Sequence, residues 1–217
     1  MYYAVWRNKM GNDIKKPEYS VENFKCDFLI EVQEYLDNIS DEELANAADL
    51  IIKCVENGCR VHVSGIGKPS HVAQYIAALM SSTGTPSYFL DGTEAVHGSC
   101  GQTRPGDVVI VISNSGETSE MKSLVSALIN NHCEIIGVSG KKQSWLALHS
   151  DAFIYAAVNK ECGPLNRAPR LSVIAETIAL QALSVILQNY NKVTPEQYIR
   201  WHPGGALGKL RDGEEEN

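Results

Sequence analysis

The chain has 217 residues and a net charge of −7, with 44% apolar and 21% charged residues. This length suffices for one α/β domain with a full core. The acidic balance argues against a general nucleic-acid binder, which would carry a basic face. It does not exclude a small anionic ligand, because a local nest of backbone N–H groups can bind phosphate in an acidic protein.

The six cysteines form no Cys-x-x-Cys pair, and no Cys/His cluster has zinc spacing. The first residues contain no apolar run typical of a secretory signal, and no segment approaches a membrane span of about 20 apolar residues. We therefore expect a cytoplasmic protein with free thiols, no metal and no membrane partner.

In chain order, residues 1–19 are polar and irregular, and we interpret them as an N-terminal arm or an oligomer contact. A helix is predicted over about 21–38, with Phe24, Phe28, Val32 and Leu36 on one face. The sequence Ser-Asp-Glu-Glu at 40–43 is typical of a capping box and begins a second helix, which ends at Gly58.

Short apolar runs then alternate with helical patterns. Strands are predicted at 60–63, 87–90, 107–112, 134–138 and 153–155, and a long helix at about 172–190. Strands that alternate with helices imply right-handed βαβ units and a parallel sheet. We expect one domain over 20–210, followed by a solvated acidic tail at 211–217.

The strongest local signal is the sequence Ser113-Asn114-Ser115-Gly116-Glu117-Thr118, which follows the most apolar strand directly. The hydroxyls of Ser113, Ser115 and Thr118, the amide of Asn114 and free backbone N–H groups at a helix start suit a phosphate dianion. An ordinary strand-to-helix turn needs one capping hydroxyl, not three. The pattern therefore favours a phosphate site.

A second polar loop, Ser64-Gly65-Ile66-Gly67-Lys68, leaves an earlier strand. Gly65 and Gly67 permit close approach of a ligand, and Lys68 adds a cation where the helix dipole is already positive, so an anion is expected there. A solvated lysine beside a turn is the alternative. The third glycine of a dinucleotide fingerprint is missing, which disfavours a Rossmann-type nucleotide protein.

The order Ser-Gly-Ile-Gly-Lys, Glu-Ala-x-His-Gly, Ser-Asn-Ser-Gly-Glu-Thr, Lys-Glu-Cys and His-Pro-Gly-Gly resembles the sugar isomerase (SIS) domain family. More narrowly, it resembles the SIS domain of arabinose 5-phosphate isomerases, over about residues 40–210. The resemblance implies a flavodoxin-like three-layer αβα sandwich with a five-stranded parallel sheet. It also implies a homo-oligomer, a dimer or tetramer, whose sites borrow groups from neighbouring subunits. Many members also carry regulatory CBS modules, and we expect none in this chain.

The resemblance further implies aldose–ketose isomerisation of a sugar phosphate through an enediol, with D-arabinose 5-phosphate and D-ribulose 5-phosphate as the expected pair. Such a reaction needs a base, a proton shuttle and an electrophile, but no metal or cofactor. Five residues match the family's catalytic positions: Lys68, His97, Glu120, Glu161 and His202. Each of them singly is as well explained by a turn, a cap or a solvated charge.

Other readings stay open at this point. A non-catalytic SIS module that binds or senses a sugar phosphate would keep the serine loop but lose the acid/base set. A hexulose-phosphate isomerase or an amino-sugar-phosphate lyase is disfavoured by the His-Pro-Gly-Gly ending. The chain also departs from the family, because Arg170-Leu171-Ser172-Val173-Ile174 replaces a hydroxyl-rich segment, so substrate contacts or subunit packing there must differ.

Overall fold

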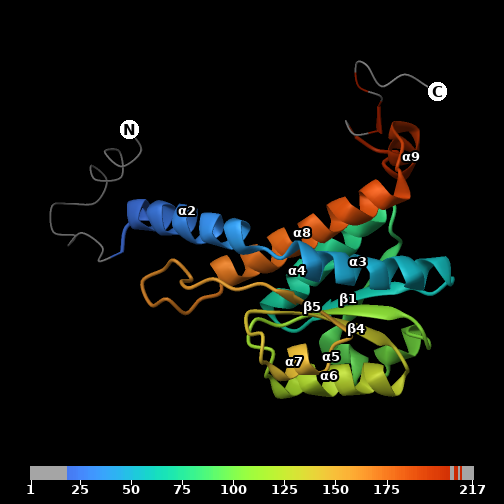
Figure 1. The fold of residues 1–217 in the computed structure, drawn as a ribbon, viewed down its shortest axis with the longest axis horizontal. Helices are drawn as coiled ribbons and strands as arrows, with labels where there is room; N and C mark the ends of the chain where they lie inside the picture. The colour runs from blue at the N-terminus through green and yellow to red at the C-terminus, as the bar shows by residue number, and fades with distance from the viewer. Residues whose placement is uncertain (1–18, 206–207, 210, 212–217) are drawn as a thin grey trace.

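The computed structural model describes residues 19–205, 208–209 and 211. Five parallel strands form one sheet in the order β2-β1-β3-β4-β5, with helices on both faces (Figure 1). The strands are β1 (Val61–Gly65), β2 (Ser87–Asp91), β3 (Val108–Ile112), β4 (Glu134–Ser139) and β5 (Ala152–Tyr155). The predicted three-layer α/β sandwich with a five-stranded parallel sheet is confirmed.

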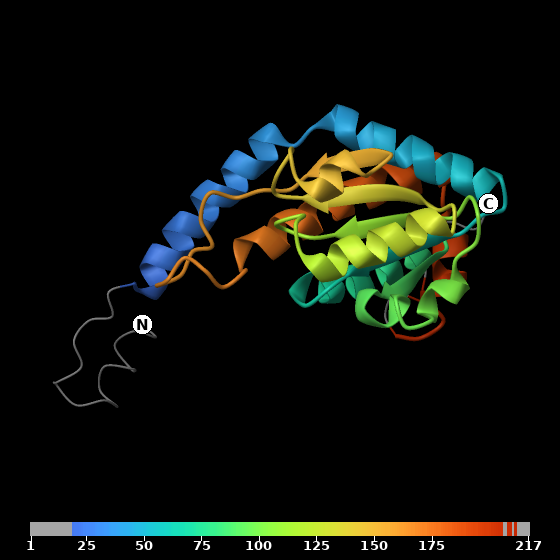
Figure 2. The ribbon, with the colours of Figure 1, turned by 90° about the horizontal axis from the view of Figure 1, so that it is seen from below.

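Two apolar layers enclose the sheet. One lies between the sheet and the helices α3 (Asp41–Glu56), α4 (Lys68–Ser82) and α8 (Leu171–Asn191). The other lies beneath α5 (Gly92–Ala95), α6 (Ser119–Asn130) and α7 (Trp145–Leu148), on the opposite face (Figures 1 and 2). Strands β1 and β3 are buried along their whole length, which explains why β3 is an unbroken apolar run, whereas β1 also contains the buried polar residues His62 and Ser64.

The first predicted helix is present as α2 (Val21–Asn38), and its predicted apolar face is only partly buried. The buried residues of α2 are Glu31 and Tyr35, and Leu36 is 47% exposed. The physical reason is that α2 extends beyond the sheet and packs mainly along the start of α8 and the chain before it (Figure 2). Much of its apolar surface therefore has no packing partner among the described residues of the chain.

The predicted capping box at the start of α3 is half formed. Ser40 accepts the Glu43 N–H at 3.2 Å, but the Glu43 carboxylate turns away and accepts the Tyr155 N–H at 2.7 Å. The short elements α5, α7, the 3₁₀ turn η1 (Ser99–Gln102) and α9 (Pro195–Trp201) have too few residues for a periodic signal and were not predicted.

Contrary to the sequence expectation, α8 is long and apolar enough to cross a membrane by length and mean hydropathy alone. It packs instead as a core helix against α3 and α4, and half of its apolar stretch is buried inside the protein. Residues 1–18 of the arm predicted at 1–19, and residues 212–217 of the tail predicted at 211–217, lie outside the described residues.

Candidate phosphate site and proton-transfer residues

The candidate site lies where the strand order reverses. β1 is followed along the chain by its neighbour β2 on one side, whereas β3 lies on its other side. The loops that leave β1 and β3 therefore diverge to opposite faces of the sheet and leave a crevice at its carboxyl edge. The glycine loop ending at Lys68 follows β1, and the serine loop follows β3, so the two predicted loops lie side by side here.

The serine loop is braced by its own hydroxyls. Ser113 Oγ accepts the Gly116 N–H at 3.2 Å, and Ser115 Oγ accepts the Glu117 N–H at 3.3 Å. Gly140 N–H donates to the Asn114 carbonyl, which ties the loop to the end of β4. Each serine hydroxyl still has a proton to donate, so the same groups that shape the loop remain donors for an anion.

The helix after the loop begins with an unused cap. Thr118 is the N-cap residue of α6, but its side chain makes no capping hydrogen bond. Its hydroxyl is therefore available beside the positive end of a 12-residue helix. The nearby acid Glu117 does not compete for this position, because it pairs with Lys122 at 2.8 Å and accepts the Trp145 N–H at 2.8 Å.

Glu120 lies one residue into α6 and is exposed. Its own backbone N–H, and then the Ser119 hydroxyl at 3.0 Å, lower its pKa below the usual value. Both bonds favour the ionised form, so Glu120 is a carboxylate at neutral pH and can accept a proton but not donate one.

Lys68 is the first residue of α4 and is exposed, with no ion-pair partner among the described residues. Gly67 before it has φ +70° and open space where a Cβ would lie. Gly65 is required for a different reason, since a Cβ there would lie 2.9 Å from the Pro69 carbonyl carbon.

Ser64 is fully buried and faces the α6 layer, with its hydroxyl unpartnered in the described structure. Its predicted role in binding therefore stays a prediction.

His97 follows α5 at the carboxyl end of β2, which is the neighbour of β1 in the sheet. Its backbone N–H donates to the Glu94 carbonyl at 2.9 Å, and Gly98 turns the chain with φ +121°. The imidazole is exposed. His97, Lys68 and the serine loop therefore come from three strands at the same edge of the sheet.

Glu161 belongs to the loop before α8 and caps that helix. Its Oε2 accepts the N–H groups of Arg170 at 2.7 Å, Leu171 at 2.8 Å and Ser172 at 3.1 Å. These bonds fix the orientation of the carboxylate and satisfy the first turn of α8. Oε1 accepts none of them, so one oxygen is anchored and the other can accept a proton.

Helices α4 and α8 run parallel, which places Glu161 at the same end as Lys68. Gln181 Nε2 donates to the Tyr75 hydroxyl at 2.9 Å, and Asn191 Nδ2 donates to the Gly84 carbonyl at 3.0 Å. The contacts advance in the same direction along both helices. The N-termini of α4 and α8 therefore lie at the same end of the molecule.

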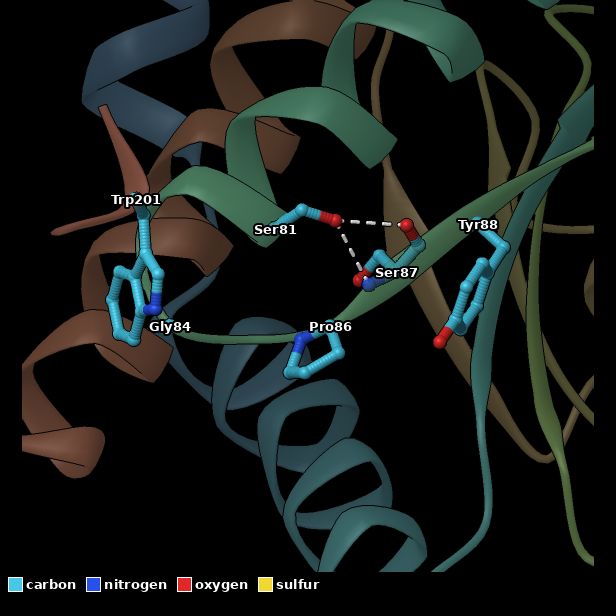
Figure 3. Close-up of a pocket in the computed structure, with 6 residues that line it drawn as sticks. All are labelled: Ser81, Gly84, Pro86, Ser87, Tyr88 and Trp201. Atoms are coloured by element: carbon cyan, nitrogen blue, oxygen red, sulfur yellow. Dashed lines mark hydrogen bonds between the residues drawn. The ribbon is translucent and has the colours of Figure 1, made fainter. Parts of the chain in front are cut away.

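His202 lies at the other end. It follows α9, and the ring of its neighbour Trp201 lies beside Gly84, where the two line one side of a pocket of about 200 Å³ (Figure 3). Gly84 lies just past the last turn of α4, and that 15-residue helix is about 22 Å long. Within one chain, His202 is therefore remote from Lys68. Its ring stacks on Tyr198, and Nδ1 lies 2.7 Å from the Tyr198 carbonyl.

Sequence reasoning missed Glu176, the most perturbed acid of the described residues. It is fully buried in the second turn of α8, and neither carboxyl oxygen has a hydrogen-bond partner. Burial raises its pKa to about 8, and the charge on Glu161 adds to the rise. A single acid within the apolar stretch of α8 was the signal that could have found it.

The described residues contain no cluster of His, Cys, Asp or Glu that could hold a metal ion.

The fold and the loops at its reversal point define a doubly wound protein with a candidate site for a phosphorylated ligand. Comparison with known families gives the particular class, because the SIS domain model matches residues 55–186. The chain belongs to the SIS-domain family, and the predicted family membership is confirmed.

Curated relatives support the same family assignment. Arabinose 5-phosphate isomerase KdsD of Escherichia coli K12 is 36% identical over 199 residues, which is 92% of this chain and 58% of that protein. KdsD of Francisella tularensis is 35% identical over 190 residues, which is 88% of this chain and 58% of that protein. The chain thus spans less than two thirds of the length of these relatives.

Solved structures give the same fold. The c3406 protein of Escherichia coli CFT073, solved as a ligand complex, has a TM-score of 0.76 at 34% identity, over 84% of this chain and 95% of that chain. A Bacteroides fragilis protein described as a phosphosugar isomerase involved in capsule formation has a TM-score of 0.78 at 29% identity, over 86% and 99%. The Vibrio vulnificus NanR protein complexed with ManNAc-6P shares the fold at 16% identity and a TM-score of 0.67, over 83% and 66%.

Proposed function

We propose that the chain is a cytoplasmic sugar-phosphate aldose–ketose isomerase, with D-arabinose 5-phosphate and D-ribulose 5-phosphate as its substrate pair. The observation that carries the proposal is the serine loop beside the unpaired Lys68 at the reversal point of the sheet. Hydroxyl protons and helix N–H groups of the serine loop lie at the same edge of the sheet as Lys68, which has no ion-pair partner among the described residues. The sequence identity of 36% to KdsD, over 92% of this chain, supports the choice of substrate.

In this proposal the phosphate is held by Ser113, Ser115 and Thr118, and Lys68 binds phosphate charge or polarises the substrate oxygen. A glutamate moves the proton between C1 and C2 through an enediol, and the histidines serve ring opening and the oxygen-bound proton. Glu161 is the better candidate for the base, because three backbone N–H groups hold one oxygen and leave the other free. Glu120 is exposed on the first turn of α6 and less constrained.

The position of His202 leads to the oligomer. His202 lies about the length of α4 from Lys68, so one chain does not assemble the full set. We propose that a second copy supplies His202 to the site of the first, in a homodimer or homotetramer. Helix α2 supports an association surface of this kind, since Val21, Leu29 and Ile30 are each more than half exposed.

The test is a coupled assay against a panel of aldose and ketose phosphates, followed by mixing of variants. K68A and H202A should each be inactive alone. The two variants are then mixed in equal amounts and reassembled. A site that takes Lys68 from one copy and His202 from another contains both intact residues with a probability of about one in four. Recovery of about a quarter of wild-type activity is expected, whereas no recovery would mean that each chain works alone.

The sensing alternative is favoured by one observation, which is that the Glu161 carboxylate already caps α8. A purely structural Glu161 would leave a protein that binds sugar phosphates without turning them over. Tight binding with no turnover on any member of the panel would therefore decide for this alternative.

A further inference from the structure

The carboxyl group of Glu176 lies where a charge has no support. It is 0% exposed, and neither oxygen has a hydrogen-bond partner among the residues that the structure describes. Ser172, one turn earlier on α8, is 1% exposed, and its hydroxyl is likewise unpartnered. Residues four apart share one face of a helix, so two polar groups face the interior together without partners.

The groups that face this position offer no cation. From α2 comes Tyr35, whose hydroxyl donates to the Tyr155 carbonyl and whose pKa is raised by burial and by the charges of Glu43 and Glu176. From α3 comes Glu43, which is bonded to the Tyr155 N–H and paired with Lys142.

The other neighbours of this face are an anion and an apolar helix. The loop before α8 contributes Glu161, which carries a negative charge toward Glu176. The buried residues of α4 are all apolar, and its Tyr75 is bonded to Gln181 further along α8. A buried acid with only neutral and anionic neighbours is stable in its protonated form.

Glu161 and Glu176 act on the same helix end. Glu161 Oε2 holds the first three free N–H groups of the α8 start, at Arg170, Leu171 and Ser172. A second negative charge one turn into the helix would repel the Glu161 carboxylate and would draw water into the apolar face of α8. The cap at Glu161 therefore depends on Glu176 remaining uncharged.

We propose that Glu176 is a positioning residue of the site, whose buried, uncharged carboxyl group keeps Glu161 bonded to the N-terminus of α8. The inference rests on the proposed isomerase function, in which Glu161 is the candidate base. When Glu176 loses its proton in mildly alkaline solution, the cap loosens and Glu161 leaves its working orientation. Activity then falls as the pH rises, although Glu176 does not touch the substrate.

Two readouts test this, and one of them does not require turnover. Hydrogen exchange of the amides at 170–172 reports the cap directly, and kcat/KM from pH 6.5 to 9.5 reports the site. The variants are E176Q and E176M, two side chains of similar length that cannot ionise. The matched control is E31Q, which alters a buried glutamate of α2 whose Oε2 accepts the Asn159 N–H.

At pH 6.5 the three amides should exchange equally in wild type and E176Q. At pH 9.5 they should exchange about tenfold faster in wild type than in E176Q. A factor of about ten corresponds to one pKa unit. The alkaline fall of kcat/KM should move at least about one pH unit upward in E176Q and E176M, and E31Q should follow wild type. A wild-type to E176Q exchange ratio that stays constant with pH overturns the proposal, as does an unmoved alkaline limb in both variants. If no sugar phosphate is turned over, the proposed function fails, and the exchange ratio alone still decides the role of Glu176.

Discussion

Replacement of Glu176 by glutamine should change how the stability of the protein depends on pH. The carboxyl group has a pKa of about 8 in the folded chain because it is buried, against an ordinary value of 4.5. Folding therefore favours the protonated form. The stability that this group contributes is fully present below the unfolded pKa and is lost as the pH rises towards the folded pKa.

The magnitude follows from the two pKa values. One pKa unit corresponds to about 1.4 kcal/mol, so ionisation of the unfolded chain penalises folding by about 1 kcal/mol at pH 5 and by about 4 kcal/mol at pH 8. Wild type should therefore lose about 3 kcal/mol of unfolding free energy relative to E176Q between these two pH values. The unpartnered amide of the new glutamine lowers the unfolding free energy of E176Q by an amount that does not vary with pH. The comparison therefore uses the change of unfolding free energy with pH in each protein, not its absolute value.

The assay is urea denaturation at pH 5, 6, 7 and 8, at one protein concentration, because oligomers gain stability with concentration. E196Q is the control, since Glu196 is a partly exposed acid on α9 whose pKa is lowered, first by the Thr194 hydroxyl. It should not reproduce the effect. Parallel stability curves for wild type and E176Q would refute the reasoning, because they would mean that Glu176 is ionised at little cost in the folded chain.

Three further predictions concern the site and its frame. K68A should weaken binding of a sugar phosphate about 10- to 100-fold in calorimetry, the range for a bond to a charged group, and a change below about twofold would remove Lys68 from the phosphate site. G116A should lower the free energy of unfolding by about 2–3 kcal/mol, because its Cβ would overlap Ser144, the capping serine of α7. The control is G58A, which has a similar positive φ but open space around the Cβ and should lose only about 1 kcal/mol. Equal losses in the two variants would argue against the overlap. D107A should lose about 3 kcal/mol in thermal or urea unfolding, since Asp107 accepts the Arg60 N–H at 2.8 Å and bonds the buried His62 at 3.2 Å, and a loss below about 1 kcal/mol would make this cluster dispensable.

The sheet could be predicted from the sequence because its signals are local. A strand buried on both faces must be apolar throughout, so 108–112 stands out as Val-Val-Ile-Val-Ile, and its polar loop follows directly. The same locality gave the Ser40 cap and the glycine at the end of α3. Where a helix has few neighbours to pack on among the described residues, an apolar periodicity does not predict a buried face. The apolar face of α2 was predicted correctly as a pattern but not as a buried surface.

The site shows the same limit at longer range. Lys68, His97 and the serine loop each follow a strand, so sheet topology alone brings them to one edge. Glu161 and His202 flank the two ends of one 21-residue helix, which holds them about 30 Å apart in the chain. A motif that needs both must be completed either by a second copy or not at all. Glu176 stands out in the sequence as a single acid in an apolar stretch, but the groups that face it are known only from the fold, because they come from other helices and from the loop before α8.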